Sequence, residues 1–151
     1  MTPARRGAYL LIDGALHRFP DGLVLGVPTD LGALDASHIL RAEGTRRVRD
    51  DLTSGGAPLT GDTTVGALVR RRLGDEAFEV LVEPLLSGVN AGNADHLSVR
   101  SGAPQLAAAV NDQPSLIAGL RAQRAAAGAD PDAPVFYGLR RGTSSLTDAL
   151  A

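Results

Sequence analysis

The residues best suited to contact a ligand lie in a stretch with almost no bulky side chains, Ser-Gly-Val-Asn-Ala-Gly. Glycine has no Cβ, so a backbone that contains it can approach another molecule closely. We predict that this stretch forms one wall of a pocket for a flat, bulky, largely apolar ligand. The alternative is that it only ends the preceding helix, where glycine is common. The candidate binding residues are Ser87, Gly88, Val89, Asn90, Ala91 and Gly92.

Three consecutive arginines, Arg70 to Arg72, are the next candidates. A guanidinium group can pair with a carboxylate through two hydrogen bonds. Successive residues of a helix point about 100° apart, so three in a row cannot converge on one ligand. We therefore predict a solvated or salt-bridged helix face here. Asp75 and Glu76 are interpreted as favourable charges at a helix N-terminus and not as an acid/base pair.

Other residue types that perform chemistry offer no convincing pattern. The histidines, His17, His38 and His96, are far apart, so we predict no metal site. The chain has no cysteine, which excludes thiolate nucleophiles, disulfides and cysteine metal sites. No serine has the Gly-x-Ser-x-Gly context of a hydrolase nucleophile. We therefore assign no catalytic residue and no metal ligand within these residues.

Composition narrows the classes of partner. A net charge of -2 gives no broad basic field, so we predict no nucleic-acid partner. Apolar runs are far shorter than the roughly 20 residues that cross a bilayer, so we predict no transmembrane segment, which leaves peripheral membrane contact open. The lack of cysteine fits a reducing cytoplasm. The length of 151 residues suits one domain with a real core.

The first elements are predicted from turn chemistry. Two short apolar runs flank Asp13-Gly14 and predict a β-hairpin over residues 8–19, since a type I′ turn needs positive φ at both central positions. Thr29 or Asp30 can cap the helix that follows. Between residues 31 and 52 we predict two short helices, with Gly32 and Gly44 as interruptions and Thr45 as a new cap.

Helical periodicity continues to about residue 124. Val65, Leu68, Val69 and Leu73 share one helix face, with a cap among residues 62–64 and Gly74 as the stop. Asp75 is predicted to cap the next helix, and Pro84 to kink it. Later helices are predicted to begin at residues 97–98, to be interrupted at Pro104, and to begin again at residues 114–115.

The last segment is predicted to hold a strand over residues 135–137 and a short helix capped by Ser144 or Ser145. The fold class expected from the whole pattern is α+β and mostly α-helical, with an N-terminal β-hairpin followed by helices at about residues 30–124. No strand–Gly-x-Gly-x-x-Gly–helix arrangement occurs, so no Rossmann-like FAD-binding domain is predicted in these residues.

One run resembles a known enzyme family. Residues 70–98 read RRRLGDEAFEVLVEPLLSGVNAGNADHLS, with a basic triplet, Leu-Gly-Asp-Glu, Glu-Pro-Leu-Leu-Ser-Gly, Ala-Gly and Leu-Ser in order. This order resembles the protoporphyrinogen and coproporphyrinogen oxidases, FAD enzymes of haem synthesis. Further similar positions are Leu16-His17 with Pro20 and Gly22, Gly26 to Thr29, Pro104-Gln105 and Ser115-Leu116.

The resemblance implies a fragment of an oxygen-dependent flavoprotein oxidase that converts coproporphyrinogen III or protoporphyrinogen IX to the porphyrin. Residues 1–134 would be a partial substrate-binding domain, and residues 135–151 would lead back toward a missing FAD domain. The implied ligand of residues 87–92 is a tetrapyrrole, and FAD would be bound elsewhere, so this fragment alone would be inactive. The alternative is a non-catalytic helical module that binds a porphyrin or a partner and has no redox centre of its own.

Overall fold

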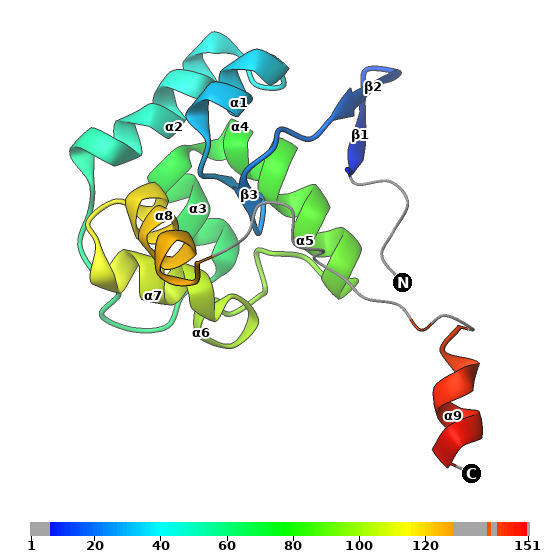
Figure 1. Cartoon of the computed structure of the whole chain (residues 1–151). Coiled ribbons are helices and arrows are strands. Elements are labelled where there is room, and N and C mark those ends of the chain that lie inside the picture. Colours follow the sequence, from blue (N-terminus) through cyan, green and yellow to red (C-terminus); the bar gives the residue numbers. More distant parts are fainter. Residues whose placement is uncertain (1–6, 129–138, 140–141, 151) are drawn as a thin grey trace.

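The computed structural model describes residues 7–128, 139 and 142–150. The hairpin predicted over residues 8–19 is confirmed, as β1 (Tyr9–Ile12) pairs antiparallel with β2 (Ala15–Arg18). The turn residues Asp13 and Gly14 have φ of 49° and 79°, both positive as a type I′ turn requires. Figure 1 shows this hairpin standing beside a body of helices. The predicted strand at residues 135–137 lies outside the described residues.

A second, smaller hairpin follows between the first hairpin and the helix after Asp30. Its strands are β3 (Leu23–Val24) and β4 (Val27–Pro28). Gly26 turns the chain at φ 83°. A Cβ at this position would lie 2.6 Å from the Cα of Val82, so only glycine lets the turn pack against the helix there.

Two short helices follow, as predicted, but the predicted break between them is wrong. They are α1 (Leu31–Ser37) and α2 (Ala42–Ser54), and the chain breaks at His38, which has a φ of 49°. Asp30 caps α1 by accepting hydrogen bonds from two backbone N–H groups at 2.9 and 3.0 Å. Gly44 does not interrupt α2 but lies inside it. A side chain at this position would collide with the Glu76 carboxylate, which explains the glycine.

The central helices also begin and end largely as predicted. Thr64 caps α3 (Val65–Leu73) through a 3.1 Å hydrogen bond from the Ala67 N–H group, and Gly74 ends it with a φ of 91°. The next helix starts as α4 (Asp75–Ala77). The prediction that Asp75 caps it is wrong, because Asp75 is its first residue and makes no capping hydrogen bond.

The predicted disturbance at Pro84 takes the form of a widened helical turn. A π-helical segment, η1 (Phe78–Val82), connects α4 to α5 (Glu83–Asn90). The Glu83 N–H group donates to the Phe78 carbonyl, five residues earlier. A π turn just before a proline rearranges the backbone hydrogen bonds where proline has no N–H group to give.

The later helices are α6 (Val99–Gly102), α7 (Pro104–Asp112), α8 (Leu116–Ala126) and α9 (Ser144–Leu150). Ser98 and Ser115 cap α6 and α8 by accepting hydrogen bonds from backbone N–H groups at 3.1 and 3.0 Å. Among the described residues, no helix is long and apolar enough to span a bilayer. The largest fully buried side chains, which form the core between α2, α3, η1, α7 and α8, include Phe78, Leu68, Leu73, Leu81, Leu106, Leu116, Ile117 and Leu120.

Candidate functional site

The predicted binding stretch begins inside α5 and passes its C-terminal end. Residues 87–90 are helical, and Ala91 ends the helix in the left-handed region with a φ of 51°. Gly88 and Val89 face outward: the Val89 residue is 77% exposed, and no atom lies within 4 Å of a Cβ built at Gly88. Gly88 and Val89 thus form an exposed surface at this helix end.

A hollow of about 190 Å³ lies next to this helix end. Gly92 lines it, whereas Ser87, Gly88, Val89 and Ala91 are not among its lining residues. The hollow is smaller than the roughly 300–1,000 Å³ of pockets that enclose a drug-sized ligand. It can therefore accept only part of a larger flat molecule. Its lining residues are Leu86, Gly92, Asn93, Ala94, His96 and Leu97.

Residues 93–97 were not among the predicted binding residues, although Asn93 and Asp95 around a small residue are typical of a turn. In the structure the Asn93 side-chain oxygen accepts a 2.6 Å hydrogen bond from the Asp95 N–H group. The His96 N–H group donates to the Asn93 carbonyl at 3.0 Å. These two bonds fold the chain into the tight loop that forms most of the hollow.

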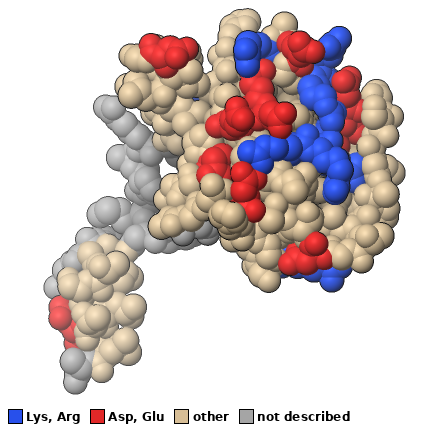
Figure 2. Space-filling view, turned by 180° about the vertical axis from the view of Figure 1, so that it is seen from behind, with Lys and Arg blue, Asp and Glu red and all other residues tan. Residues whose placement is uncertain are grey.

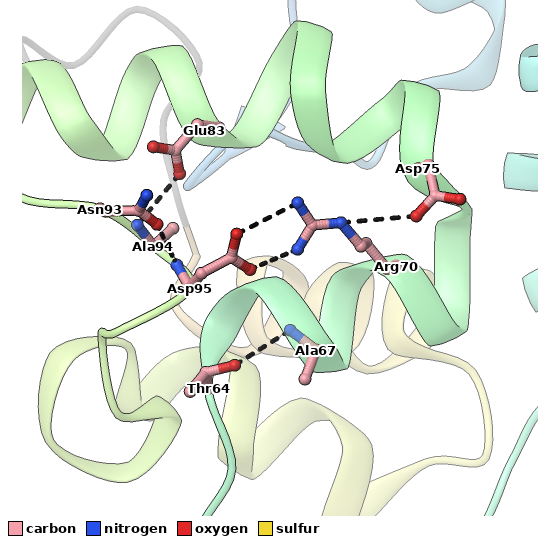
Figure 3. A network of polar contacts seen from close by, with 8 residues as sticks. All are labelled: Thr64, Ala67, Arg70, Asp75, Glu83, Asn93, Ala94 and Asp95. Atoms are coloured by element: carbon pink, nitrogen blue, oxygen red, sulfur yellow. Dashed lines mark hydrogen bonds and ion pairs between the residues drawn. The ribbon is translucent and has the colours of Figure 1, made fainter.

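This loop is attached to α3 by an ion pair. The Arg70 guanidinium grips the Asp95 carboxylate with both terminal nitrogens, through Nη1 to Oδ1 and through Nη2 to Oδ2 at 3.2 Å (Figure 3). Its Nε lies 3.4 Å from Asp75, and its plane covers the Phe78 ring at 3.8 Å from the centroid. The hydrogen bond with Asp95 raises the pKa of Arg70 and lowers the pKa of Asp95.

The same loop is attached to α5 and to the start of α3 through its backbone. The Glu83 Oε2 atom accepts a 3.0 Å hydrogen bond from the Ala94 N–H group, as Figure 3 shows. The Ala94 carbonyl accepts another, also 3.0 Å, from the Gly66 N–H group. A Cβ on Gly66 would collide with the Asp95 carboxylate and lie 2.9 Å from Arg70 Nη1, so this packing needs glycine.

Helix geometry predicted that the three arginines would not converge on one ligand, and they do not. Arg70 binds Asp95, Arg71 is exposed, and Arg72 points into the protein. The prediction of a solvated or salt-bridged face is wrong for Arg72, which is 3% exposed and donates to the carbonyls of Pro114 at 2.7 Å and Ala57 at 2.9 Å. Burial lowers the pKa of Arg72.

Asp51 is a second buried charged residue. Its role was not predicted either, because nothing in the residues around it in the sequence indicates that it is buried. Its Oδ2 atom accepts hydrogen bonds from the Ser115 hydroxyl at 2.6 Å and from the Ile117 N–H group at 3.0 Å. Asp51 therefore connects α2 to the N-terminus of α8, where negative charge is favourable. Arg72 instead joins α3 to the segments before α8 and after α2, and neither Asp51 nor Arg72 lines the hollow next to α5.

Asp75 and Glu76 lie in the first turn of α4, as expected, and the Glu76 carboxylate also binds at the N-terminus of α2. Its Oε1 atom accepts from the N–H group of Arg41, the residue before α2, at 2.9 Å and from Arg41 Nε at 3.1 Å. Figure 2 shows arginine and acidic side chains interspersed over one face of the helical body. Such alternation gives no broad field of one sign on that face.

Neither a metal nor FAD fits the residues that the structure describes. In that part of the chain, no group of three His, Cys, Asp or Glu side chains is placed to hold a metal ion. The described sheets are two-stranded and antiparallel, β1 with β2 and β3 with β4. A dinucleotide site needs a parallel sheet with a glycine-rich turn leading into a helix, so the described residues give FAD no such cradle.

No protein-family profile matches the chain. Individual proteins of similar sequence are porphyrinogen oxidases. Coproporphyrinogen III oxidase of Bacillus subtilis is 36% identical over 117 residues, which is 78% of this chain and 25% of that protein. Human protoporphyrinogen oxidase is 34% identical over 120 residues, 78% of this chain and 23% of that protein.

A solved structure from Exiguobacterium, assigned to the protoporphyrinogen oxidases, has a TM-score of 0.78 and 35% identity over 96% of this chain. It shares the fold of this chain within 31% of its own length. The chain spans about a quarter of the length of the relatives it matches. On these matches, the chain is a homologue of one part of the coproporphyrinogen III and protoporphyrinogen oxidases.

Proposed function

We propose that the chain is the porphyrinogen-binding part of an oxidase that converts coproporphyrinogen III or protoporphyrinogen IX to the porphyrin in haem biosynthesis. The observation that carries this proposal is that 96% of the chain follows the fold of one solved family member, within about a third of that member. Residues 1–134 are the substrate-binding portion, and residues 135–151 lead toward the flavin-binding portion. A chain without cysteine suits a cytoplasmic enzyme.

The binding surface in this proposal is the end of α5. Residues 87–92 form one wall of a slot, and the adjacent hollow receives an edge of the macrocycle. A macrocycle on this surface would contact small side chains and backbone, which allow a close approach over a wide area. The opposite wall comes from other polypeptide, since the hollow of about 190 Å³ holds only part of the ligand.

FAD, held by polypeptide outside the described residues, would supply the redox chemistry, and the residues of this chain would bind and orient the macrocycle. We assign no proton transfer to any side chain here.

A fluorescence titration of coproporphyrin III against residues 1–151, with a Gly88→Val variant, tests the proposal. Open space surrounds Gly88, so valine leaves the fold intact and only fills the slot. We expect roughly tenfold weaker binding, because overfilling a packed contact costs on the order of 1–3 kcal/mol. Gly61→Val is the matched control, as Gly61 is also exposed with open space around it. Equal affinity in the Gly88 variant removes residue 88 from the site, and no binding by the parent chain refutes the proposal.

A further inference from the structure

The loop from Gly92 to Leu97, here called the pocket loop, supplies five of the six residues that line the hollow next to α5. Its shape therefore sets the shape of the hollow. Residues that touch no part of the hollow hold this loop, and they lie on α3 and α5. They come from the run that resembles the porphyrinogen oxidases, within its basic triplet and its Glu-Pro segment.

On the α3 side, Arg70 has a fixed geometry. Its helix is anchored in the core by Val69 and Leu73, both fully buried. Asp95 takes the two terminal nitrogens, Asp75 lies near Nε, and Phe78 supports the guanidinium plane. A guanidinium group held from several sides loses little further freedom when it grips a carboxylate. Asp95 is thus bound at a defined position relative to α3.

On the α5 side, Glu83 holds Ala94, the residue of the pocket loop before Asp95. Its carboxylate holds the Ala94 N–H group, while the Gly66 N–H group holds the Ala94 carbonyl. Ala94 is 1% exposed and lines the hollow. The far end of the loop is attached as well, since the Val65 N–H group donates to the Leu97 carbonyl at 2.9 Å.

The Arg70–Asp95 pair is too exposed to contribute much to the stability of the whole fold. The Arg70 and Asp95 side chains are 32% and 38% exposed, and ion pairs in such positions typically add little to global stability. A bidentate pair between a core helix and a loop instead restricts the local opening of that loop. The pair therefore orders the pocket loop more than it stabilises the domain.

From this arrangement we infer that Arg70 is a positioning residue for the macrocycle: through Asp95 it fixes the pocket loop against α3 and so keeps the hollow open. Arg70 does not touch the ligand itself. The inference rests on the proposed function, because it concerns the same ligand surface.

The test compares Arg70→Gln, Asp95→Asn and the double variant of residues 1–151 in coproporphyrin III titrations, with amide hydrogen exchange measured in parallel. Each single variant should bind roughly three- to tenfold more weakly, and the double variant should be no weaker than either, because all three remove one interaction. Exchange at Ala94 and His96 should rise severalfold. Arg70→Lys keeps the charge without the fork and should restore part of the affinity. Arg71→Gln, an exposed arginine on the same helix, should change neither readout.

The outcomes separate this inference from the proposed function. If the parent chain binds no coproporphyrin III, the proposed function fails and the inference fails with it. If the parent binds and Arg70→Gln binds equally well, the inference alone is overturned. It is also overturned if the two single losses add fully in the double variant, or if affinity falls only in proportion to the folded fraction measured by circular dichroism.

Discussion

At the scale of single residues, some of the polar groups that hold the structure together could be predicted from the sequence and others could not. Thr64, Ser98 and Ser115 were predictable as caps, because a cap depends on residues two or three positions away. Asp51 and Arg72 were not, since their partners lie tens of residues away in the sequence. The Arg70–Asp95 pair also joins residues far apart, and helix geometry could only exclude convergence of the arginine triplet.

Gly66 gives a prediction at this scale. Replacing glycine by alanine inside a helix normally stabilises it by up to about 1 kcal/mol. At Gly66 the sign should reverse, because the new Cβ would meet the Asp95 carboxylate and the Ala94 loop must shift. We expect Gly66→Ala to lower the free energy of unfolding by about 1–3 kcal/mol in urea denaturation.

Gly61→Ala is the control for that measurement. Gly61 has no neighbour within 4 Å of a Cβ, so its variant should be neutral or slightly stabilised. A Gly66→Ala protein at least as stable as the parent would show that the packing around the ion pair yields easily.

The pH dependence of the pocket loop follows from Asp95. The hydrogen bond with Arg70 holds the pKa of Asp95 below its ordinary value of 3.8. A carboxylate with a lowered pKa in the folded state contributes stability above its unfolded pKa and loses it as the pH falls through the folded pKa. Amide exchange at Ala94, corrected for intrinsic rates, should therefore accelerate as the pH falls below about 4.

Asp95→Asn removes this titrating group and should flatten that acid-side change. Asp62, whose pKa is also lowered, chiefly by the Ser98 hydroxyl, should still affect the start of α6 at acid pH. Equal acid sensitivity at Ala94 in the parent and the Asn variant would assign the effect to another group.

At the scale of elements, the turns and helix ends that depend on neighbouring residues were predicted correctly. The type I′ turn at Asp13-Gly14, the two helices after Asp30 and the stop at Gly74 all depend on backbone conformations within a few residues. The break at His38 was misplaced to Gly44, because a helical glycine and a helix-ending one look alike in sequence. The contact with Glu76 that explains Gly44 exists only in the packed structure. The π segment before Pro84 had no sequence signal beyond the proline.

The hairpin β1–β2 has two apolar side chains that are exposed and not packed against the core. Leu11 and Leu16 face each other across the strands and are 71% and 73% exposed. Replacing both with threonine keeps β propensity and should change the free energy of unfolding by no more than about 0.5 kcal/mol. Binding of the apolar dye ANS should fall, because an exposed apolar patch is removed.

Leu10→Thr in the same strand is the comparison, because Leu10 is half-buried and packs against the core. It should cost clearly more stability than the Leu11/Leu16 double variant. A large stability loss in the double variant would mean that the outer face of the hairpin is packed in solution.

At the scale of the whole molecule, binding and redox chemistry should be separable. The chain spans about a quarter of the length of its relatives, and the described residues contain only antiparallel two-stranded sheets. A dinucleotide fold places the pyrophosphate at a helix N-terminus after a parallel strand, and the described residues have no such strand. The α5 end and its hollow, in contrast, depend only on α3, α5 and the pocket loop.

We therefore expect purified residues 1–151 to show no flavin absorbance and to leave the fluorescence of added FAD unchanged, while still responding to coproporphyrin III. A flavoprotein titrated in parallel verifies that the assay detects FAD binding. A yellow protein would contradict this expectation and would require a flavin site built from residues outside those described. Porphyrin binding without flavin binding would instead mean that the macrocycle surface forms independently of the redox centre, because the ion pair and the backbone bonds that shape it all lie within this chain.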